Sequence, residues 1–171
     1  TKRFRLDPTT STDKVRVALE LEGQYCSEGE GGVCTRITPP VKMTANLVDP
    51  LTKENSAAED GAKKNVASFR TSQRPTKGKT NPAELRVQLG PVKSSNGKKI
   101  RLALTLILDE GWHTFSTTFK GDGGTPTEIS LKAVHGLKPI GDGFVPDRTP
   151  EIKEEPELKL VQEVYHDRVT W

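Results

Sequence analysis

The sequence predicts an all-β fold, an antiparallel β-sandwich, on three observations. Apolar and polar residues alternate over several short stretches, turns rich in Gly and Pro separate those stretches, and no strong helical apolar period is present. Alternation with period two puts the apolar side chains of a strand on one face and its polar side chains on the other. Half-buried strands of this kind pair as antiparallel sheets that bury their apolar faces against each other.

Composition divides the chain into two strand-rich halves joined by a polar segment. Residues 1–48 hold a clean alternating stretch at 15–22, in which every second residue is Val or Leu. Residues 49–83 have almost no apolar periodicity, and such a composition buries too little apolar surface to offset chain entropy. We therefore predict a flexible linker at 49–83 and a second strand half at 84–171.

The second half contains the strongest strand of the chain, at 100–108, where every even position is apolar. Further alternating stretches lie at 85–89 and 128–134. Residues 135–157 are rich in Gly and Pro and are predicted to form a long loop. The last strand is expected at 158–171, with a possible break near Tyr165.

Both cysteines lie in one segment between two predicted strands. Seven residues separate Cys26 from Cys34, and three of them are glycines, which supply the positive φ angles of a tight reversal. A hairpin of this kind brings the two Cα atoms within about 5–6 Å, the range of a disulfide. With no further metal ligands beside it, such a pair suits an oxidising compartment better than a zinc site.

Charge and hydropathy argue against several partners. The net charge is only +3, and no Lys/Arg cluster is combined with stacking aromatic residues, so we expect no nucleic-acid binding. No apolar run approaches the roughly 20 residues of a membrane span, so contact with a membrane is expected only through a parent protein. The chain begins at Thr1 without an apolar signal segment, as expected of a fragment of a longer product.

The histidines predict no metal site. His113, His135 and His166 lie in three different segments, and none has a second ligand type at a spacing of two or four residues. A structural zinc site needs four converging ligands. The Gly-rich segments lack the strand and helix context of a phosphate loop. We therefore expect no metal and no other cofactor.

Three segments resemble the amino-terminal periplasmic domain of the DsbD family of thiol:disulfide interchange proteins, also called the disulfide bond corrector domain. They are a strand leading to Gln-Tyr-Cys, a turn, a second Cys and Pro-Pro at 15–40; a strand leading to Glu-Gly-Trp-His-Thr-Phe at 100–131; and Glu-Val-Tyr-His-Asp-Arg-Val-Thr at 163–170. The cysteine spacing is wider than in the family, and the order of the two halves is inverted. Either the chain spans the end of one such domain and the start of a second, or its halves pair as one permuted sandwich. Exposed edges of each half would also allow a strand-swapped homodimer.

The resemblance implies an immunoglobulin-like fold in a periplasmic or other extracytoplasmic location. It also implies electron exchange between the cysteine pair and thioredoxin-fold partner proteins. In the family, aromatic residues and a loop shield the pair, and the matching positions are Trp112, Phe115 and Tyr165, with Tyr25 beside the first cysteine. The matching loop is 139–157.

Two functions remain open from the sequence. In the first, Cys26 and Cys34 are the catalytic pair of a thiol–disulfide exchange module; either could attack, and Cys34 is preferred because Arg36 favours its thiolate while Glu28 and Glu30 oppose ionisation of Cys26. In the second, the domain is a non-catalytic binding or spacer sandwich. Its disulfide would then be structural, stabilising the fold by roughly 2–3 kcal/mol.

Overall fold

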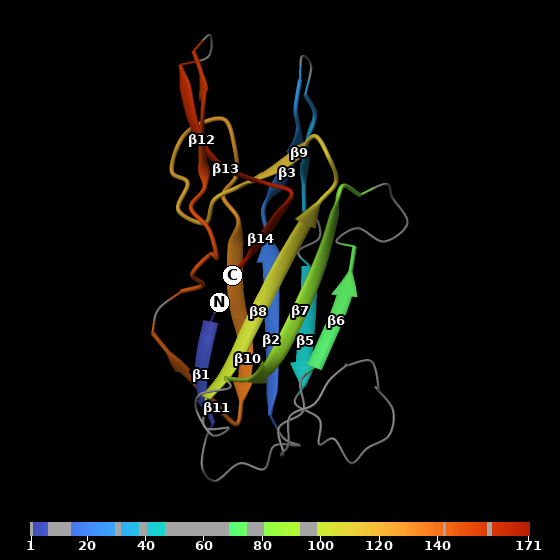
Figure 1. Ribbon diagram of the computed structural model, residues 1–171, viewed down its shortest axis with the longest axis vertical. Helices are drawn as coiled ribbons and strands as arrows, with labels where there is room; N and C mark the ends of the chain where they lie inside the picture. The colour runs from blue at the N-terminus through green and yellow to red at the C-terminus, as the bar shows by residue number, and fades with distance from the viewer. Residues whose placement is uncertain are drawn as a thin grey trace.

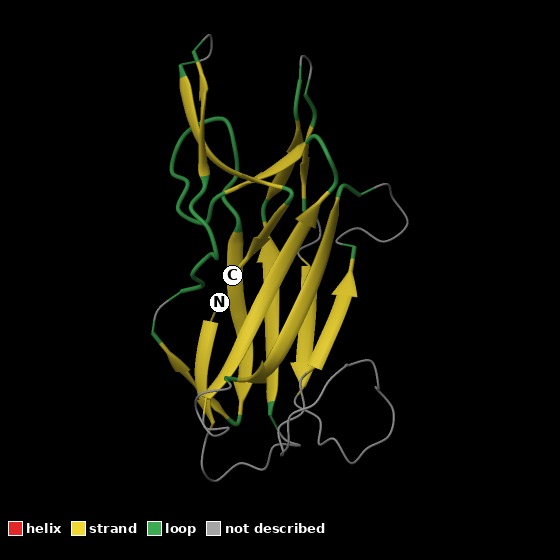
Figure 2. Ribbon diagram, viewed as in Figure 1, coloured by secondary structure: helices red, strands yellow, loops and turns green. Residues whose placement is uncertain are grey.

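The protein is described from a computed structural model. The model describes residues 2–6, 15–29, 32–37, 41–46, 69–74, 81–92, 99–141, 143–156 and 159–171. Within these ranges every regular element is a strand, none is a helix, and every strand pairing is antiparallel (Figure 2). The predicted all-β class is confirmed.

The strands follow the chain from β1 to β14. Their bounds are β1 (Lys2–Leu6), β2 (Arg16–Glu22), β3 (Gln24–Ser27), β4 (Cys34–Arg36), β5 (Val41–Asn46), β6 (Phe69–Gln73), β7 (Ala83–Pro91), β8 (Lys99–Leu108), β9 (Trp112–Phe115), β10 (Glu128–His135), β11 (Leu137–Ile140), β12 (Glu151–Glu155), β13 (Leu160–His166) and β14 (Arg168–Thr170).

Two sheets pack face to face and form the sandwich, which we call the body. One is six-stranded, in the order β11-β1-β8-β7-β6 with β14 also paired to β8, and the other is three-stranded, in the order β10-β2-β5 (Figure 1). The alternation in β7 and β8 points every second side chain inward, as the sequence predicts. The resulting core joins buried residues of both sheets: Phe4, Val17, Leu19, Leu21, Leu85, Val87, Leu89, Ile100, Leu102, Leu104 and Leu106.

A five-stranded sheet, in the order β12-β13-β9-β3-β4, continues the body at one end (Figure 1). Three of its strands are extensions of body strands: β3 follows β2 after Gly23, β9 follows β8 after a short turn, and β13 leads into β14. Gly23 lies where the chain passes from one sheet to the next, and a Cβ there would lie 3.3 Å from the Cα of Thr127. This third sheet carries both cysteines.

Strands from the two halves of the chain pair with each other in all three sheets. In the first half, β1 pairs with β8, β2 with β10, and β3 with β9. The halves therefore share their sheets within one chain. The structure describes no pairing between chains, so the swapped homodimer stays a prediction.

Three local expectations need correction. Residues 69–73, assigned to the linker by composition, form β6 and pair with β7; the rest of 49–83 is described only at 74 and 81–83. The expected loop at 135–157 contains β11 and β12. The expected last strand begins two residues late and is divided at Asp167, whose φ is 55°. Composition did not predict β6 and β12 because backbone hydrogen bonds hold such strands, while the side chains of β12 and of Arg70, Ser72 and Gln73 in β6 stay largely exposed.

Among the described residues, no helix has the length and apolar character needed to cross a membrane.

Candidate functional site

Cys26 and Cys34 form a disulfide between two neighbouring strands. The strands β3 and β4 pair so that Cys26 lies directly opposite Cys34, with their Cα atoms 4.0 Å apart. The hairpin is closed by a hydrogen bond of 3.0 Å from the Ser27 amide to the Val33 carbonyl. The predicted cysteine hairpin is therefore present, and its disulfide joins two strands that already share backbone hydrogen bonds.

The two cysteines differ strongly in their surroundings. Cys34 is exposed on β4, which forms one edge of the five-stranded sheet as described and whose residues are all exposed. Cys26 is only 4% exposed and packs with Phe115, Phe119 and Val164 in a small apolar cluster. The Gln24 amide also donates a hydrogen bond of 3.4 Å to the Cys26 sulfur. A visiting protein can therefore approach Cys34 more easily than Cys26.

The strand register aligns the disulfide with two histidines. Cys26 lies directly opposite His113 on β9, and His113 lies directly opposite His166 on β13. Residues opposite each other on paired strands project from the same face of a sheet. Cys34, Cys26, His113 and His166 therefore form one row across four strands, which we call the Cys–His row.

The predicted shielding residues divide between the two faces of this sheet. Phe115 lies on the face of the Cys–His row and packs in the cluster that holds Cys26. Tyr25 and Tyr165 lie on the opposite face, each directly opposite Thr114. Both tyrosines belong to the core of the body, and Trp112 packs against that core. Only Phe115 of the four is brought together with the disulfide.

His113 is buried, and it has no hydrogen-bond partner among the residues that the structure describes. It is 3% exposed, and neither ring nitrogen makes a hydrogen bond. Burial, with smaller contributions from the charges of Lys153 and His166, lowers the pKa of His113 to about 4, and Glu28 opposes this shift only in part. The imidazole is therefore neutral at physiological pH, with a lone pair available on one nitrogen.

His166 lies between two carboxylates beside His113. Its Nε2 is 2.8 Å from Glu28 Oε1, and its Nδ1 is 3.2 Å from Glu151 Oε2. Glu28 Oε1 also lies 4.0 Å from His113 Nδ1, and the two imidazole rings meet edge to face at 5.7 Å between centroids. Sequence reasoning missed this cluster because its members lie up to 138 residues apart. The sequence could have shown that each of the three residues lies near the end of a strand. It could not show that they lie close together, because that depends on the register of β3, β9 and β13.

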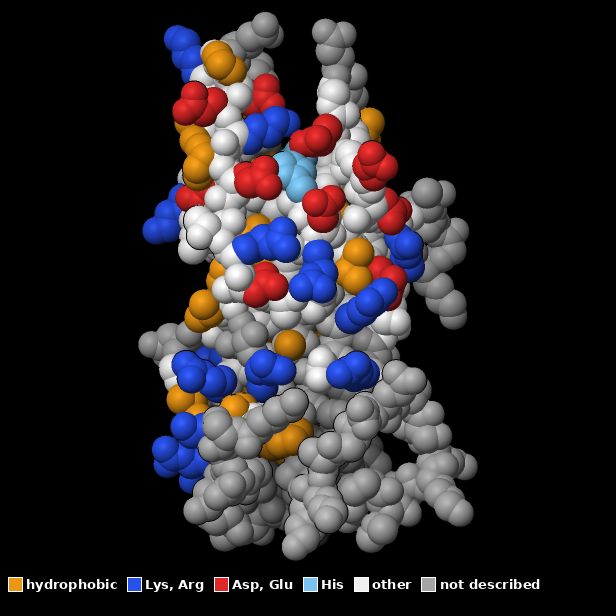
Figure 3. Space-filling model, viewed as in Figure 1, with side chains coloured by type: hydrophobic (Ala, Val, Ile, Leu, Met, Phe, Trp, Pro, Cys, Tyr) orange, Lys and Arg blue, Asp and Glu red, His pale blue; other side chains and the backbone are white. Residues whose placement is uncertain are grey.

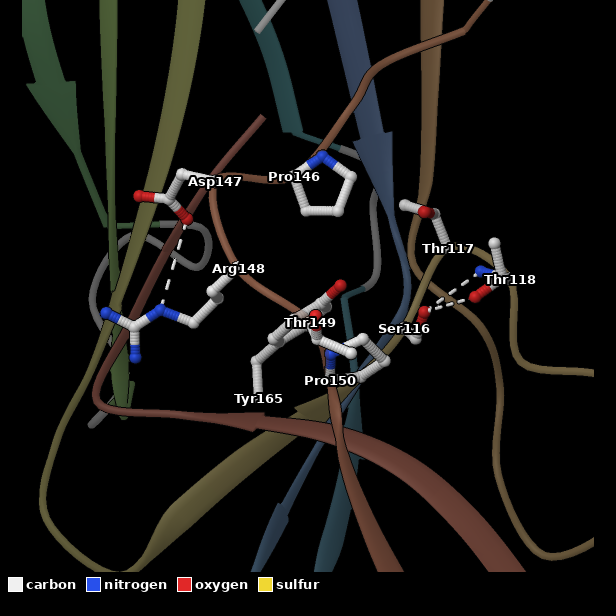
Figure 4. A pocket seen from close by; sticks show the side chains of 9 residues that line it. All are labelled: Ser116, Thr117, Thr118, Pro146, Asp147, Arg148, Thr149, Pro150 and Tyr165. Atoms are coloured by element: carbon white, nitrogen blue, oxygen red, sulfur yellow. Dashed lines mark hydrogen bonds and ion pairs between the residues drawn. The ribbon is translucent and has the colours of Figure 1, made fainter.

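The segment predicted to shield the cysteines contributes to two different places. Glu151, at the start of β12, contacts the Cys–His row through His166. Residues 146–150 instead line an open surface pocket of about 450 Å³, together with residues 116–118 and Tyr165 (Figure 4). Its charged lining groups, Asp147 and Arg148, face each other as an ion pair at 4.0 Å. We assign no chemistry to this pocket.

The fold and the cysteine pair define an all-β sandwich protein with a disulfide at the edge of one sheet. Comparison with known protein families, with characterised proteins and with solved structures finds no match. The resemblance to the DsbD family therefore stays a prediction from the sequence motifs.

Proposed function

We propose that this protein is a thiol–disulfide exchange module that passes reducing equivalents to or from thioredoxin-fold partners through Cys26 and Cys34. The observation that carries the proposal is the unequal burial of the two cysteines. Cys34 is exposed on an edge strand, whereas Cys26 is 4% exposed. Exchange needs one sulfur that a partner can reach and a second that can resolve the mixed disulfide.

The exchange proceeds through two displacements at sulfur. A partner thiolate attacks Cys34, a new S–S bond forms between them, and the Cys26–Cys34 bond breaks with its electron pair left on Cys26 as a thiolate. A second partner thiolate then attacks the partner's own sulfur in the mixed disulfide and releases Cys34. The partner's two thiols are thereby oxidised to a disulfide, and the disulfide of this chain is reduced to two thiols. The reverse direction starts with attack by the Cys34 thiolate on a partner disulfide.

The surroundings of Cys26 suit its part in this cycle. The Gln24 amide donates to its sulfur, which favours the thiolate that forms when the bond breaks. Phe115, Phe119 and Val164 pack around Cys26 and keep it away from competing partners. The preference for Cys34 as the attacking residue follows from its exposure, together with the exposed Arg36 two residues further along β4.

The disulfide also lies where its opening leaves the body intact. Cys26 belongs to a cluster of four buried residues, separate from the large core that joins the two body sheets. The two strands that it joins remain hydrogen-bonded neighbours when it opens. Both redox forms can therefore keep the same fold, as a carrier of reducing equivalents requires.

The proposal extends to an immunoglobulin-like sandwich, related to the DsbD amino-terminal domain, in a periplasmic or other extracytoplasmic compartment. The motif resemblance and the edge disulfide support it together. An oxidising compartment allows the disulfide to persist between exchange cycles.

Mixed-disulfide trapping tests the proposal. Cys26→Ser leaves the exposed thiol without its resolving partner, so this variant should capture a thioredoxin-fold protein as a stable covalent adduct on a non-reducing gel. Cys34→Ser is the matched control and should capture far less, because its remaining thiol is buried. Equilibration in glutathione or dithiothreitol buffers should give a reduction potential of the pair above about −300 mV, whereas structural disulfides typically lie below that value. Absence of adducts from both variants, with a potential below that value, would establish the non-catalytic sandwich with a structural disulfide instead.

A further inference from the structure

We propose that Glu28, His113 and His166 form a binding site for a divalent transition-metal cation such as Zn²⁺. Glu28 directly follows β3, His113 lies on β9 and His166 lies on β13. The site does not include the cysteine thiols. It does not depend on the redox function proposed above.

The ligand atoms are already close together. One nitrogen of each histidine and one carboxylate oxygen of Glu28 all lie within 4.8 Å of one another. A tetrahedral zinc site with bonds near 2.0–2.1 Å places its ligand atoms about 3.4 Å apart. Glu28 is exposed and attached by rotatable bonds, so closing the remaining distance needs only small side-chain movements.

The burial of His113 is the second observation that points to a ligand. Buried polar atoms nearly always have a hydrogen-bond partner. Both ring nitrogens of His113 lack one although the side chain is only 4% exposed. Its ring stands beside that of His166, with centroids 5.7 Å apart. A metal bond to one of these nitrogens would satisfy its unpaired lone pair.

The remaining surroundings also suit a cation. Glu151 accepts from His166 Nδ1 at 3.2 Å, the arrangement in which an outer carboxylate fixes the orientation of a metal-binding imidazole. The charge of Lys153 acts on His113, and the Lys153 ammonium group is paired with Glu155 at 3.1 Å. Figure 3 shows an imidazole at the surface between acidic side chains at this end of the molecule.

The ligand types define the class of cation. Imidazole nitrogen suits Zn²⁺, Cu²⁺, Ni²⁺ and Co²⁺, whereas Mg²⁺ and Ca²⁺ prefer oxygen ligands alone. Three protein ligands leave a fourth position for water, as in open zinc sites.

Titration of the oxidised, tag-free chain with Co²⁺ tests the site, because the disulfide keeps both sulfurs out of coordination. We expect one Co²⁺ per chain with visible d–d absorption, displacement of Co²⁺ by Zn²⁺, and shifts of the ring ¹⁵N signals of His113 and His166. His166→Ala and Glu28→Gln, which change side chains at least partly exposed to solvent, should remove this binding. Glu151→Gln should weaken it about 10- to 100-fold.

His135→Ala is the matched control, since His135 is exposed on β10 in a different sheet. It should bind Co²⁺ like the original chain. Absence of saturable binding, equal binding by His166→Ala, or equal loss in His135→Ala would each overturn the proposal. A folded His166→Ala variant, shown by unchanged near-ultraviolet circular dichroism, excludes unfolding as the cause of any loss.

Discussion

The body and the five-stranded sheet are joined by three strands that run from one into the other, but the two regions bury different kinds of side chain. The body encloses a large core in which most side chains are aliphatic and no cysteine or histidine takes part. The five-stranded sheet has a small apolar cluster of four residues, and buried polar groups lie beside it. It holds both cysteines and two of the three histidines of the chain. Stability is thus concentrated in one region and reactive side chains in the other.

Two threonine hydroxyls connect β9 to β3 and to the segment that precedes β10. Thr114 donates to the Gln24 carbonyl at 3.0 Å, and Thr127 donates to the Phe115 carbonyl at 2.6 Å. The two threonine hydroxyls also lie 3.1 Å apart. These polar contacts hold β9 to β3 and to the segment before β10, beside the apolar contacts that Tyr25 and Tyr165 make with the core of the body.

The largest effect on stability is expected from a truncation in the body. Leu104 is fully buried at the centre of β8, so Leu104→Ala should lower the free energy of unfolding by about 2–5 kcal/mol, through lost burial and the cavity left behind. Val161→Ala is the control, because Val161 is 56% exposed on the five-stranded sheet and its loss should change stability by less than about 0.5 kcal/mol. Urea unfolding measures both. Equal effects would show that stability is not concentrated in the body.

Reduction of the disulfide is expected to change stability less than the truncation of Leu104. The bridge closes a loop between residues eight apart, so its reduction should lower the free energy of unfolding by about 2–3 kcal/mol on the loop-entropy model. The near-ultraviolet circular dichroism signal of the body should persist after reduction, because Trp171 lies outside the cysteine cluster. Trp171 is fully buried, and its backbone is hydrogen-bonded to that of Leu104. Cooperative unfolding on reduction alone would show that the bridge supports the whole fold and would favour a structural role.

The smallest effect on stability is expected from removing the charge of Glu20, which lies on β2 in the three-stranded sheet. Glu20 lies 2.5 Å from the Lys132 ammonium and 3.7 Å from that of Lys42, and the hydrogen bond from Lys132 is the main cause of its lowered pKa. A lowered pKa in the folded state stabilises the fold above the pKa of the unfolded chain, and this contribution is lost as pH falls. Glu20→Gln should therefore be less stable than the original chain at pH 7 but not at about pH 3.

Urea midpoints at the two pH values measure this difference, with Glu128→Gln as the control, since Glu128 is exposed on β10. A difference between Glu20→Gln and the original chain that persists unchanged at low pH would assign the effect to packing rather than to charge.

Much of the architecture could be predicted from local pattern. The alternation at 15–22 and 100–108 corresponds to β2 and β8, and the cysteine hairpin is present as β3 and β4. The polar strands β6 and β12 were not predictable, because their side chains do not alternate and their pairing depends on a neighbour elsewhere in the chain. The aromatic residues were predicted to shield the cysteine pair, but the sequence could not show which face of the sheet each one occupies.

The sequence by itself determined the all-β class and the position of the cysteine hairpin, because apolar alternation and Gly-rich turns act over a few residues. Only the tertiary structure decided that β3, β9 and β13 lie side by side, with Cys26, His113 and His166 in one row. That register is set by how the body strands pack and where each continues beyond the core. The burial of Cys26 against Phe115 and Val164 and the proposed metal site both depend on this long-range pairing, which no local pattern encodes.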